Sequence, residues 1–105
     1  MSNAGNEIRI LTTPLDPATW TLIEAPDDVV VGTVTARHAL KDSGGNPVTP
    51  VDVYIRSDAT DPTTEDTIPA NFERTFRFSS PMPRKGLFYA MPASGTGPLV
   101  TVCNP

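Results

Sequence analysis

The chain has 105 residues, of which 38% are hydrophobic and 19% charged, and its formal net charge is −4. This length fits one domain, and the apolar content is too high for a disordered tail. The acid excess argues against nucleic acid as a main partner, and no apolar run approaches the roughly 18 residues that span a bilayer.

Twelve prolines are spread along the chain and limit helix formation. A proline inside a helix costs about 3 kcal/mol, because it lacks a backbone donor and clashes with the preceding turn. The longer proline-free windows, 27–46, 51–61 and 70–80, are rich in β-branched or aromatic residues, which favour strands. The sequence therefore predicts at most a turn or two of helix, for which residues 36–41 are the best place.

Short runs of alternating apolar and polar residues predict seven strands. In chain order they are Glu7–Thr12, Thr19–Glu24, Val29–Arg37, Val51–Arg56, Phe72–Phe78, Leu87–Met91 and Leu99–Cys103. Gly32 within the third run indicates a bulge or a close backbone approach, and the polar stretch 57–71 is predicted to be a long loop. Residues 1–6 have no apolar anchor and are expected to form a flexible N-terminal arm before a single domain, 7–105.

No helix is available to cover the apolar strand faces, so one sheet must cover another. The predicted fold class is therefore all-β, a single antiparallel β-sandwich or small barrel of about seven strands. The predicted core consists of Ile10, Trp20, Leu22, Val31, Val51, Val53, Ile55, Phe72, Phe76, Phe78, Leu87, Tyr89, Val100 and Val102.

Reactive side chains are scarce. The single histidine, His38, is interpreted as a solvated or hydrogen-bonded residue at a strand end rather than a general base. Because Cys103 is the single cysteine, an internal disulfide is excluded. It is interpreted as a small half-buried apolar side chain, since no neighbour in the sequence would lower the pKa of its thiol. No catalytic motif is present, so the sequence predicts neither an enzyme nor a cofactor.

The loop 57–66 carries the one set of side chains with ligand chemistry. Its carboxylates, which a calcium ion would use, are Asp58, Asp61, Glu65 and Asp66. Their spacing does not match an EF-hand loop, so a solvated acidic loop is the default interpretation and calcium the alternative.

Two further binding chemistries follow from the side chains on the predicted strands. Arginines could form a platform for single-stranded nucleic acid, although the acid excess opposes this. They are Arg9, Arg37, Arg56, Arg74 and Arg77. Three aromatic side chains, Trp20, Tyr54 and Tyr89, are the candidates for sugar binding on an open sheet.

The stretches Val51–Thr63, Thr67–Phe72 and Leu87–Val102 share an order of strands and turns. This order resembles the small β-sandwich structural proteins of tailed bacteriophage virions, namely capsid decoration (cement) proteins and head or tail accessory proteins. The resemblance implies a non-enzymatic protein, made in the host cytoplasm and located on the capsid surface of the virion. It would bind the major capsid protein or another virion protein and self-associate as a trimer or dimer, with no membrane partner.

The same resemblance implies how such contacts are made. The arm 1–6, the strand Glu7–Thr12 and the segment Val100–Pro105 would add to the sheet edge of a neighbour, because an edge offers unpaired backbone groups. The alternative function is a carbohydrate-binding or adhesion-type β-sandwich module, such as a domain of a phage fibre or cell surface.

Overall fold

The computed structural model describes residues 8–26, 29–42, 44–56, 65–83 and 85–105, with the side chains of all these except 65 and 79–83. The described chain contains strands and no helix, which confirms the all-β prediction. The eight strands are β1 (Arg9–Thr13), β2 (Thr21–Glu24), β3 (Val30–His38), β4 (Val53–Arg56), β5 (Glu65–Ile68), β6 (Glu73–Pro83), β7 (Gly86–Pro92) and β8 (Leu99–Asn104). Residues 36–41, the best place for a helical turn on sequence grounds, form none, because Ala36–His38 complete β3.

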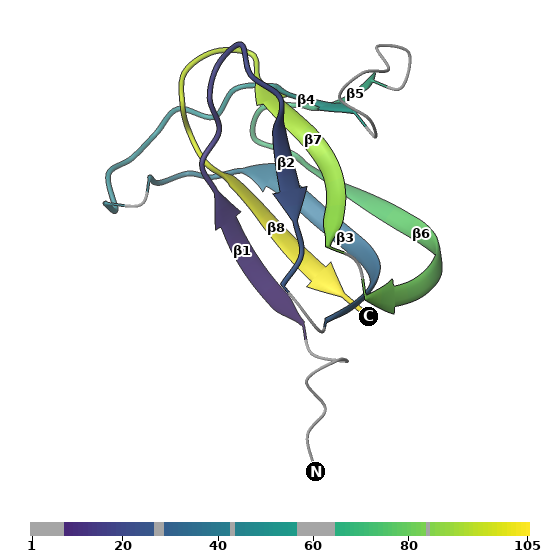
Figure 1. Ribbon diagram of the computed structural model, residues 1–105. Helices are drawn as coiled ribbons and strands as arrows, with labels where there is room; N and C mark the ends of the chain where they lie inside the picture. The colour runs from purple at the N-terminus through teal and green to yellow at the C-terminus, as the bar shows by residue number, and fades with distance from the viewer. Residues whose placement is uncertain (1–7, 27–28, 43, 57–64, 84) are drawn as a thin grey trace.

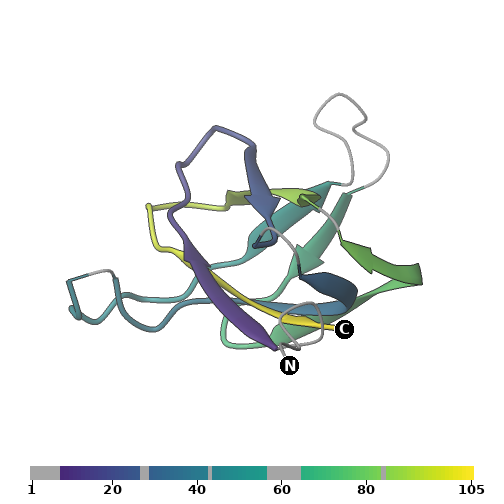
Figure 2. The ribbon, with the colours of Figure 1, turned by 60° about the horizontal axis from the view of Figure 1, so that its bottom comes forward.

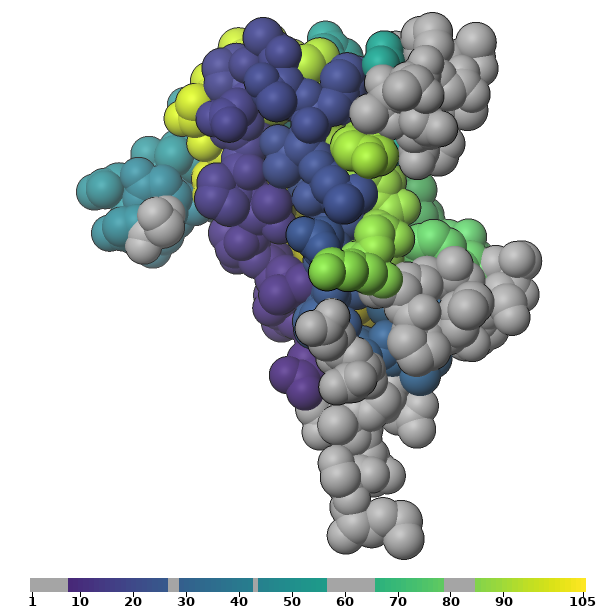
Figure 3. Space-filling model, in the orientation of Figure 1, coloured from purple at the N-terminus to yellow at the C-terminus, as the bar shows by residue number. Residues whose placement is uncertain are grey.

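Two four-stranded sheets form the molecule, and they lie as two layers in Figures 1 and 2. Sheet A has the order β1-β8-β3-β6, and sheet B has the order β2-β7-β4-β5. All paired neighbours are antiparallel, so the predicted antiparallel sandwich is confirmed. The edge strands β1 and β2 lie side by side on one flank of the molecule (Figures 1 and 3).

The core lies between the two sheets. Its buried apolar residues are Leu15, Ile23, Ala25, Val29, Val31, Val34, Ala36, Val53, Ile55, Ile68, Phe88, Ala90, Leu99 and Cys103. Phe76 of sheet A and Phe88 of sheet B join the layers, with ring centroids 5.1 Å apart and ring planes tilted by 43°. This tilted geometry is a favourable one for paired aromatic rings.

Part of the predicted core is confirmed. Val31, Val53 and Ile55 are buried. Three others are partly buried and pack against the core, namely Phe76, Phe78 and Leu87. Trp20, Val51, Tyr89, Val100 and Val102 are only half-buried, and Tyr89, Val100 and Val102 lie on the outer faces of their sheets, so the core prediction is wrong for these three.

The rest of the predicted core is on the wrong face. Ile10 and Phe72 are each 68% exposed, and Leu22 is 39% exposed, whereas its neighbour Ile23 is fully buried. In β7 and β8 the inward positions are those between the predicted ones. They are Phe88, Ala90, Leu99, Thr101 and Cys103. These strands are apolar on both faces, so alternation alone could not select the buried one.

β6 is longer than predicted, and its pairing with β3 is interrupted by an irregularity in register. Its pairing with β3 shifts between Val31, opposite Met82, and Thr33, opposite Arg77, so the extra residues lie in β6. The pairing is therefore irregular at Gly32, as predicted, but the extra residues belong to β6 and not to β3. β6 continues to Pro83 because it is an edge strand, where a missing backbone donor is tolerated.

β5 lies in the stretch predicted to be a loop, and a tight turn carries the chain from it to β6. The Phe72 N–H donates to the Pro69 carbonyl over 3.1 Å, and Asn71 adopts a φ of 66°. Asparagine tolerates this left-handed conformation better than most residues. The turn moves the chain from sheet B to sheet A and leaves Phe72 exposed.

Thr101 is the one described buried side chain whose polar atom lacks a hydrogen-bond partner. Its Oγ1 is buried on the inner side of β8, and the residue is 0% exposed. Replacing Thr101 with valine keeps the shape and removes the unpaired hydroxyl, so we expect a gain of about 1 kcal/mol in the free energy of unfolding. Thermal denaturation should show a rise in Tm of about 4–8 °C. An unchanged or lower Tm would contradict this account, and the exposed Thr12→Val variant is the matched control.

Candidate interaction surface

The outer face of sheet A presents β-branched side chains to solvent. Strand register aligns Ile10 with Val102, Val102 with Thr35, and Thr35 with Thr75, which makes one row across all four strands. The hydroxyls of Thr35 and Thr75 are 2.9 Å apart, which confirms that these side chains share this face.

We call this surface the A face. It comprises Ile10, Thr12, Thr33, Thr35, Arg37, Glu73, Thr75, Arg77, Val100, Val102 and Asn104. A shallow hollow of about 180 Å³ lies on it, lined by Ile10, Thr35, Arg37, Glu73, Val100 and Val102. Ile8, which directly precedes β1, is also exposed, at 62%. Exposed apolar side chains that gather on one face mark an interaction site more often than scattered ones do.

Charged side chains lie on the β3–β6 half of the A face. Arg37 is directly opposite Glu73, and Arg77 lies two positions beyond Thr75 on β6. All three residues are exposed, and none forms an ion pair within the part of the chain that the structure describes. These charges are therefore available to a partner.

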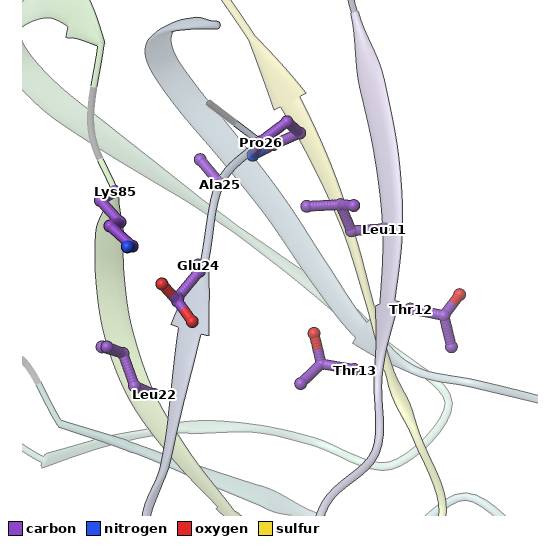
Figure 4. Close-up of a pocket in the computed structure, with 8 residues that line it drawn as sticks. All are labelled: Leu11, Thr12, Thr13, Leu22, Glu24, Ala25, Pro26 and Lys85. Carbon is purple, nitrogen blue, oxygen red and sulfur yellow. The ribbon is translucent and has the colours of Figure 1, made fainter. Parts of the chain in front are cut away.

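A groove opens between the edge strands β1 and β2 (Figures 3 and 4). It encloses about 380 Å³ and is lined by Leu11, Thr12, Thr13, Leu22, Glu24, Ala25, Pro26 and Lys85. Leu11 and Thr13 project from β1 toward β2, whereas Thr12 points away (Figure 4). Among the described strands β1 pairs with β8 alone, so the outer backbone edge of β1 is open.

The opposite flank of the sandwich is closed by an ion pair. Arg74 of β6 donates through Nη2 to Asp66 Oδ1 of β5 over 2.6 Å, and through Nε to the Thr67 carbonyl over 3.2 Å. This contact joins the edges of sheets A and B. The two flanks thus differ, and the β1–β2 flank is the open one.

The sequence analysis expected both terminal segments to contact a neighbour, and the outcome differs between the two segments. β8 lies between β1 and β3, so the expectation that Val100–Pro105 adds to a neighbour's sheet edge is wrong for this strand. β1 is an edge strand, as that expectation requires of the Glu7–Thr12 segment. The predicted arm, 1–6, lies outside the described residues.

The three aromatic candidates for sugar binding come together on the outer face of sheet B. Tyr89 lies opposite both Leu22 and Arg56, and Tyr54 lies opposite Met91. The Arg56 guanidinium carbon sits 4.2 Å from the centroid of the Trp20 ring, so it covers one side of that ring. Such cation–π contacts contribute about 0.5–1 kcal/mol at exposed sites.

The arginines predicted as a possible nucleic-acid platform are dispersed. Arg37 and Arg77 belong to the A face, and Arg56 lies on the outer face of sheet B. Arg74 lies on the β5–β6 flank, and Arg9 lies on β1 opposite Cys103, a position that is not on the A face. They therefore form no common strip along which a nucleic-acid backbone could run.

His38 is buried rather than solvated, and it ends β3. Its Nδ1 lies 2.7 Å from the Ala39 carbonyl, which can only accept, so Nδ1 carries the proton. In the neutral ring Nε2 is then the acceptor. The ring borders a hollow of about 490 Å³ lined by Asp42, Val48, Thr49, Val51 and the glycine-rich turn 94–97.

Cys103 is fully buried on the inner side of β8, where burial raises the pKa of its thiol above the ordinary value of 9.0. A raised pKa disfavours the reactive thiolate. The prediction of a small apolar role is thus supported, and burial is more complete than the sequence indicated.

Asp42 holds the turn that connects Lys41 to Pro47. Its Oδ1 accepts the backbone N–H groups of Gly44 and Asn46, each over 2.9 Å. The Asn46 amide is the largest influence that holds the pKa of Asp42 below 3.8. Gly44 and the Asn46 side chain act in the same direction, and partial desolvation opposes them.

Because the folded-state pKa of Asp42 is depressed, its stabilising contribution is present above pH 3.8 and is lost as the pH falls through the lower folded-state value. We expect the amide resonances of Gly44 and Asn46 to move together below pH 3.8 in an NMR titration. Titration of these amides at or above 3.8 would contradict the hydrogen-bonded geometry.

The acidic residues predicted as calcium ligands are placed only in part. Asp58 and Asp61 lie outside the described residues, and Glu65 is described by its backbone in β5. Asp66 binds Arg74 and the Thr67 N–H instead of facing an open site. Within the described ranges, no three His, Cys, Asp or Glu side chains form a cluster of the kind that holds a metal ion, and calcium stays a prediction.

Comparisons with known proteins give no relative for this chain. No protein-family model matches it, and neither the curated proteins nor the solved structures contain a significant match. In the parts of the chain that the structure describes, no helix is long and apolar enough to cross a membrane.

The A face was missed by sequence reasoning, although a signal for it exists. Val100 and Val102 alternate with Leu99, Thr101 and Cys103, so β8 offers two apolar faces of which only one can be buried between the sheets. A strand with two apolar faces is expected either between two layers or in a surface that awaits a partner.

Proposed function

We propose that the chain is a structural, non-catalytic protein of a virus particle. It would bind the shell of a tailed bacteriophage as a decoration protein, contact the major capsid protein and associate with copies of itself. The observation that carries this proposal is the position of Ile10, which is 68% exposed on an edge strand whose outer backbone is open.

The physical reasoning starts from what such a site can bind. An edge strand offers unpaired backbone donors and acceptors to a strand of another subunit, and flanking apolar side chains are buried when that strand is added. Ile8 and Ile10 supply such side chains beside the open edge of β1. The groove next to Leu11 and Leu22 can receive further apolar groups from the same partner.

The proposal is tested by co-sedimentation with empty shells of the tailed phage that encodes the chain. We expect the wild-type protein to pellet with the shells and Ile10→Asp to bind at least about tenfold more weakly, since a charge would replace a buried apolar contact. Leu40→Asp is the matched control, because Leu40 is 52% exposed and lies in a loop after β3. Wild-type protein that stays in the supernatant at saturating concentration would overturn the proposal.

A second candidate function rests on the row of aromatic side chains on sheet B. Trp20, Tyr54 and Tyr89 share one outer face, as a sugar-binding platform requires. Because the chain has one tryptophan, its fluorescence reports directly on this face. A glycan array followed by fluorescence titration would support carbohydrate binding if a sugar quenched Trp20 emission in the wild type and not in Tyr54→Ala.

A further inference from the structure

We propose that two copies of the chain pack A face to A face, related by a two-fold axis that runs along the row Ile10–Val102–Thr35–Thr75. The inference rests on the self-association in the proposed function and names the surface that performs it. Two copies related in this way would bring their sheets A together as aligned layers, a packing that sheets commonly adopt.

Strand register sets three parallel rows on the A face. The central row is the one named above. One flanking row is Thr12, Val100, Arg37 and Glu73, and the other contains Asn104, Thr33 and Arg77. An axis along the central row places each of its residues opposite the same residue of the second copy and places each flanking row opposite the other.

Under this symmetry the apolar end of the central row meets itself. Ile10 and Val102 would pack against their counterparts in the second copy and cover the exposed surface of Ile10. A two-fold axis parallel to the strands would instead place Ile10 opposite Thr75 and Val100 opposite Arg37. The first axis is favoured because it gives both Ile10 and Val102 apolar partners and places only Val100 opposite a polar residue, Asn104.

Charge complementarity selects the same axis. Glu73 and Arg77 lie in opposite flanking rows on β6, so the axis places Glu73 of each copy opposite Arg77 of the other. Within one copy they are four residues apart, about 13 Å along the strand, which is too far for an ion pair. Two identical ion pairs can thus form between copies from charges that lack an ion-pair partner among the described residues.

The size of the A face limits the strength of the contact. Four strands and the five residues of β1 span about 19 Å by 17 Å. Stable complexes bury about 800 Å² per partner, more than this footprint of about 320 Å² supplies in projection. We therefore expect a dissociation constant of about 10–100 μM in solution. Neighbouring copies on a shell would pair more completely, because their effective concentration is higher.

Charge reversal provides the decisive experiment. Glu73→Arg places like charges opposite each other at two sites of the symmetric dimer, and so does Arg77→Glu. Each variant should dimerise about tenfold more weakly than wild type in sedimentation equilibrium at up to about 1 mM protein. The double variant E73R/R77E swaps the two charges and should restore the wild-type constant.

Mixing the two single variants gives a second, independent readout. In a mixed dimer, each arginine of one copy meets a glutamate of the other, so the mixture should associate as tightly as wild type although each variant alone does not. Lys41→Glu and Asp16→Arg are matched charge controls at exposed positions outside the A face and the β1–β2 groove, and both should leave the constant unchanged.

Several results would overturn the inference. They are a wild-type protein that is monomeric at about 1 mM, single reversals that leave the constant unchanged, and a mixture that fails to recover it. Wild-type protein that dimerises as predicted but fails to bind shells would sustain the inference and count against the proposed function. If the wild-type protein binds shells but charge reversal at Glu73 or Arg77 leaves the dimerisation constant unchanged, the proposed function is sustained and the inference is overturned.

Discussion

Replacing Gly97 with alanine is expected to lower the free energy of unfolding by about 3 kcal/mol, a large part of the stability of a small domain. A Cβ at Gly97 would overlap Cε1 and Nε2 of the buried His38 ring. The ring is held in place by its bond to the Ala39 carbonyl. The Ala39 N–H in turn donates to the Pro98 carbonyl over 2.8 Å, so neither side of the contact can move away freely.

The double variant H38A/G97A separates this steric effect from any backbone effect. Removing the ring makes room for the new methyl group, so the two changes should cost less together than the sum of the single changes. Gly95→Ala is a useful comparison, because open space surrounds its Cβ position and its φ of 71° alone should cost about 1 kcal/mol. Urea denaturation of the wild type, of the single variants His38→Ala, Gly97→Ala and Gly95→Ala, and of the double variant measures these effects. A Gly97→Ala variant as stable as wild type would contradict the packing.

The strand content of the fold was predictable because prolines and other turn-forming residues separate short runs of β-branched and aromatic residues. Six of the seven predicted strands start and end within a few residues of the observed ones, and the fifth continues well past its predicted end at Phe78. β5 was missed because Glu65, Asp66 and Thr67 are polar and read as loop. In the structure Asp66 binds Arg74, and only Ile68 of this strand is a buried apolar side chain. A strand at a sheet edge needs little apolar character.

The faces of the strands were harder to predict than their positions. β4 alternates clearly, with Val53 and Ile55 apolar and Tyr54 amphipathic, and the prediction of its buried face is confirmed. β2, β7 and β8 carry apolar residues on both faces, so the pattern lacks the contrast that fixes a face. The space between the layers favours small residues at some inward positions, such as Ala90 and Cys103, which a hydrophobicity pattern ranks below their larger neighbours.

The same ambiguity explains why the candidate surface escaped prediction. Ile10, Val100 and Val102 looked like core residues because they are large or β-branched, and they lie on the A face instead. A protein that exposes such residues retains apolar surface to bury against a partner. The failed core prediction and the proposed assembly surface therefore concern the same side chains.

The two flanks of the sandwich differ in how they are closed. The Arg74–Asp66 pair closes the β5–β6 flank, yet both residues are more than 40% exposed, so the pair contributes at most about 1 kcal/mol. The β1–β2 flank has a groove and an open backbone edge. An assembling protein with one closed flank and one open flank can add subunits in a defined direction without growing from both sides.

Replacing Ile23 with aspartate is expected to prevent folding, whereas the same change at the adjacent Leu22 should cost no more than about 1 kcal/mol. Ile23 is fully buried between the sheets, and a carboxylate there would lose its hydration with no cation or donor to replace it. This penalty of about 4–5 kcal/mol approaches the whole stability of a small domain. Leu22 is 39% exposed on the outer face of sheet B, where water can solvate the new charge.

This pair of variants tests the register of β2 directly. The register observed here pairs Ile23 with Phe88 and Leu22 with Tyr89, and a slip of one residue would exchange the two faces. Near-UV circular dichroism of Trp20 reports whether each variant folds, and urea denaturation gives the stability of the one that does. If Leu22→Asp unfolded and Ile23→Asp did not, the side chains would face as the sequence pattern alone predicted. Leu22 would then face the core, and the outer face of sheet B would consist of other side chains.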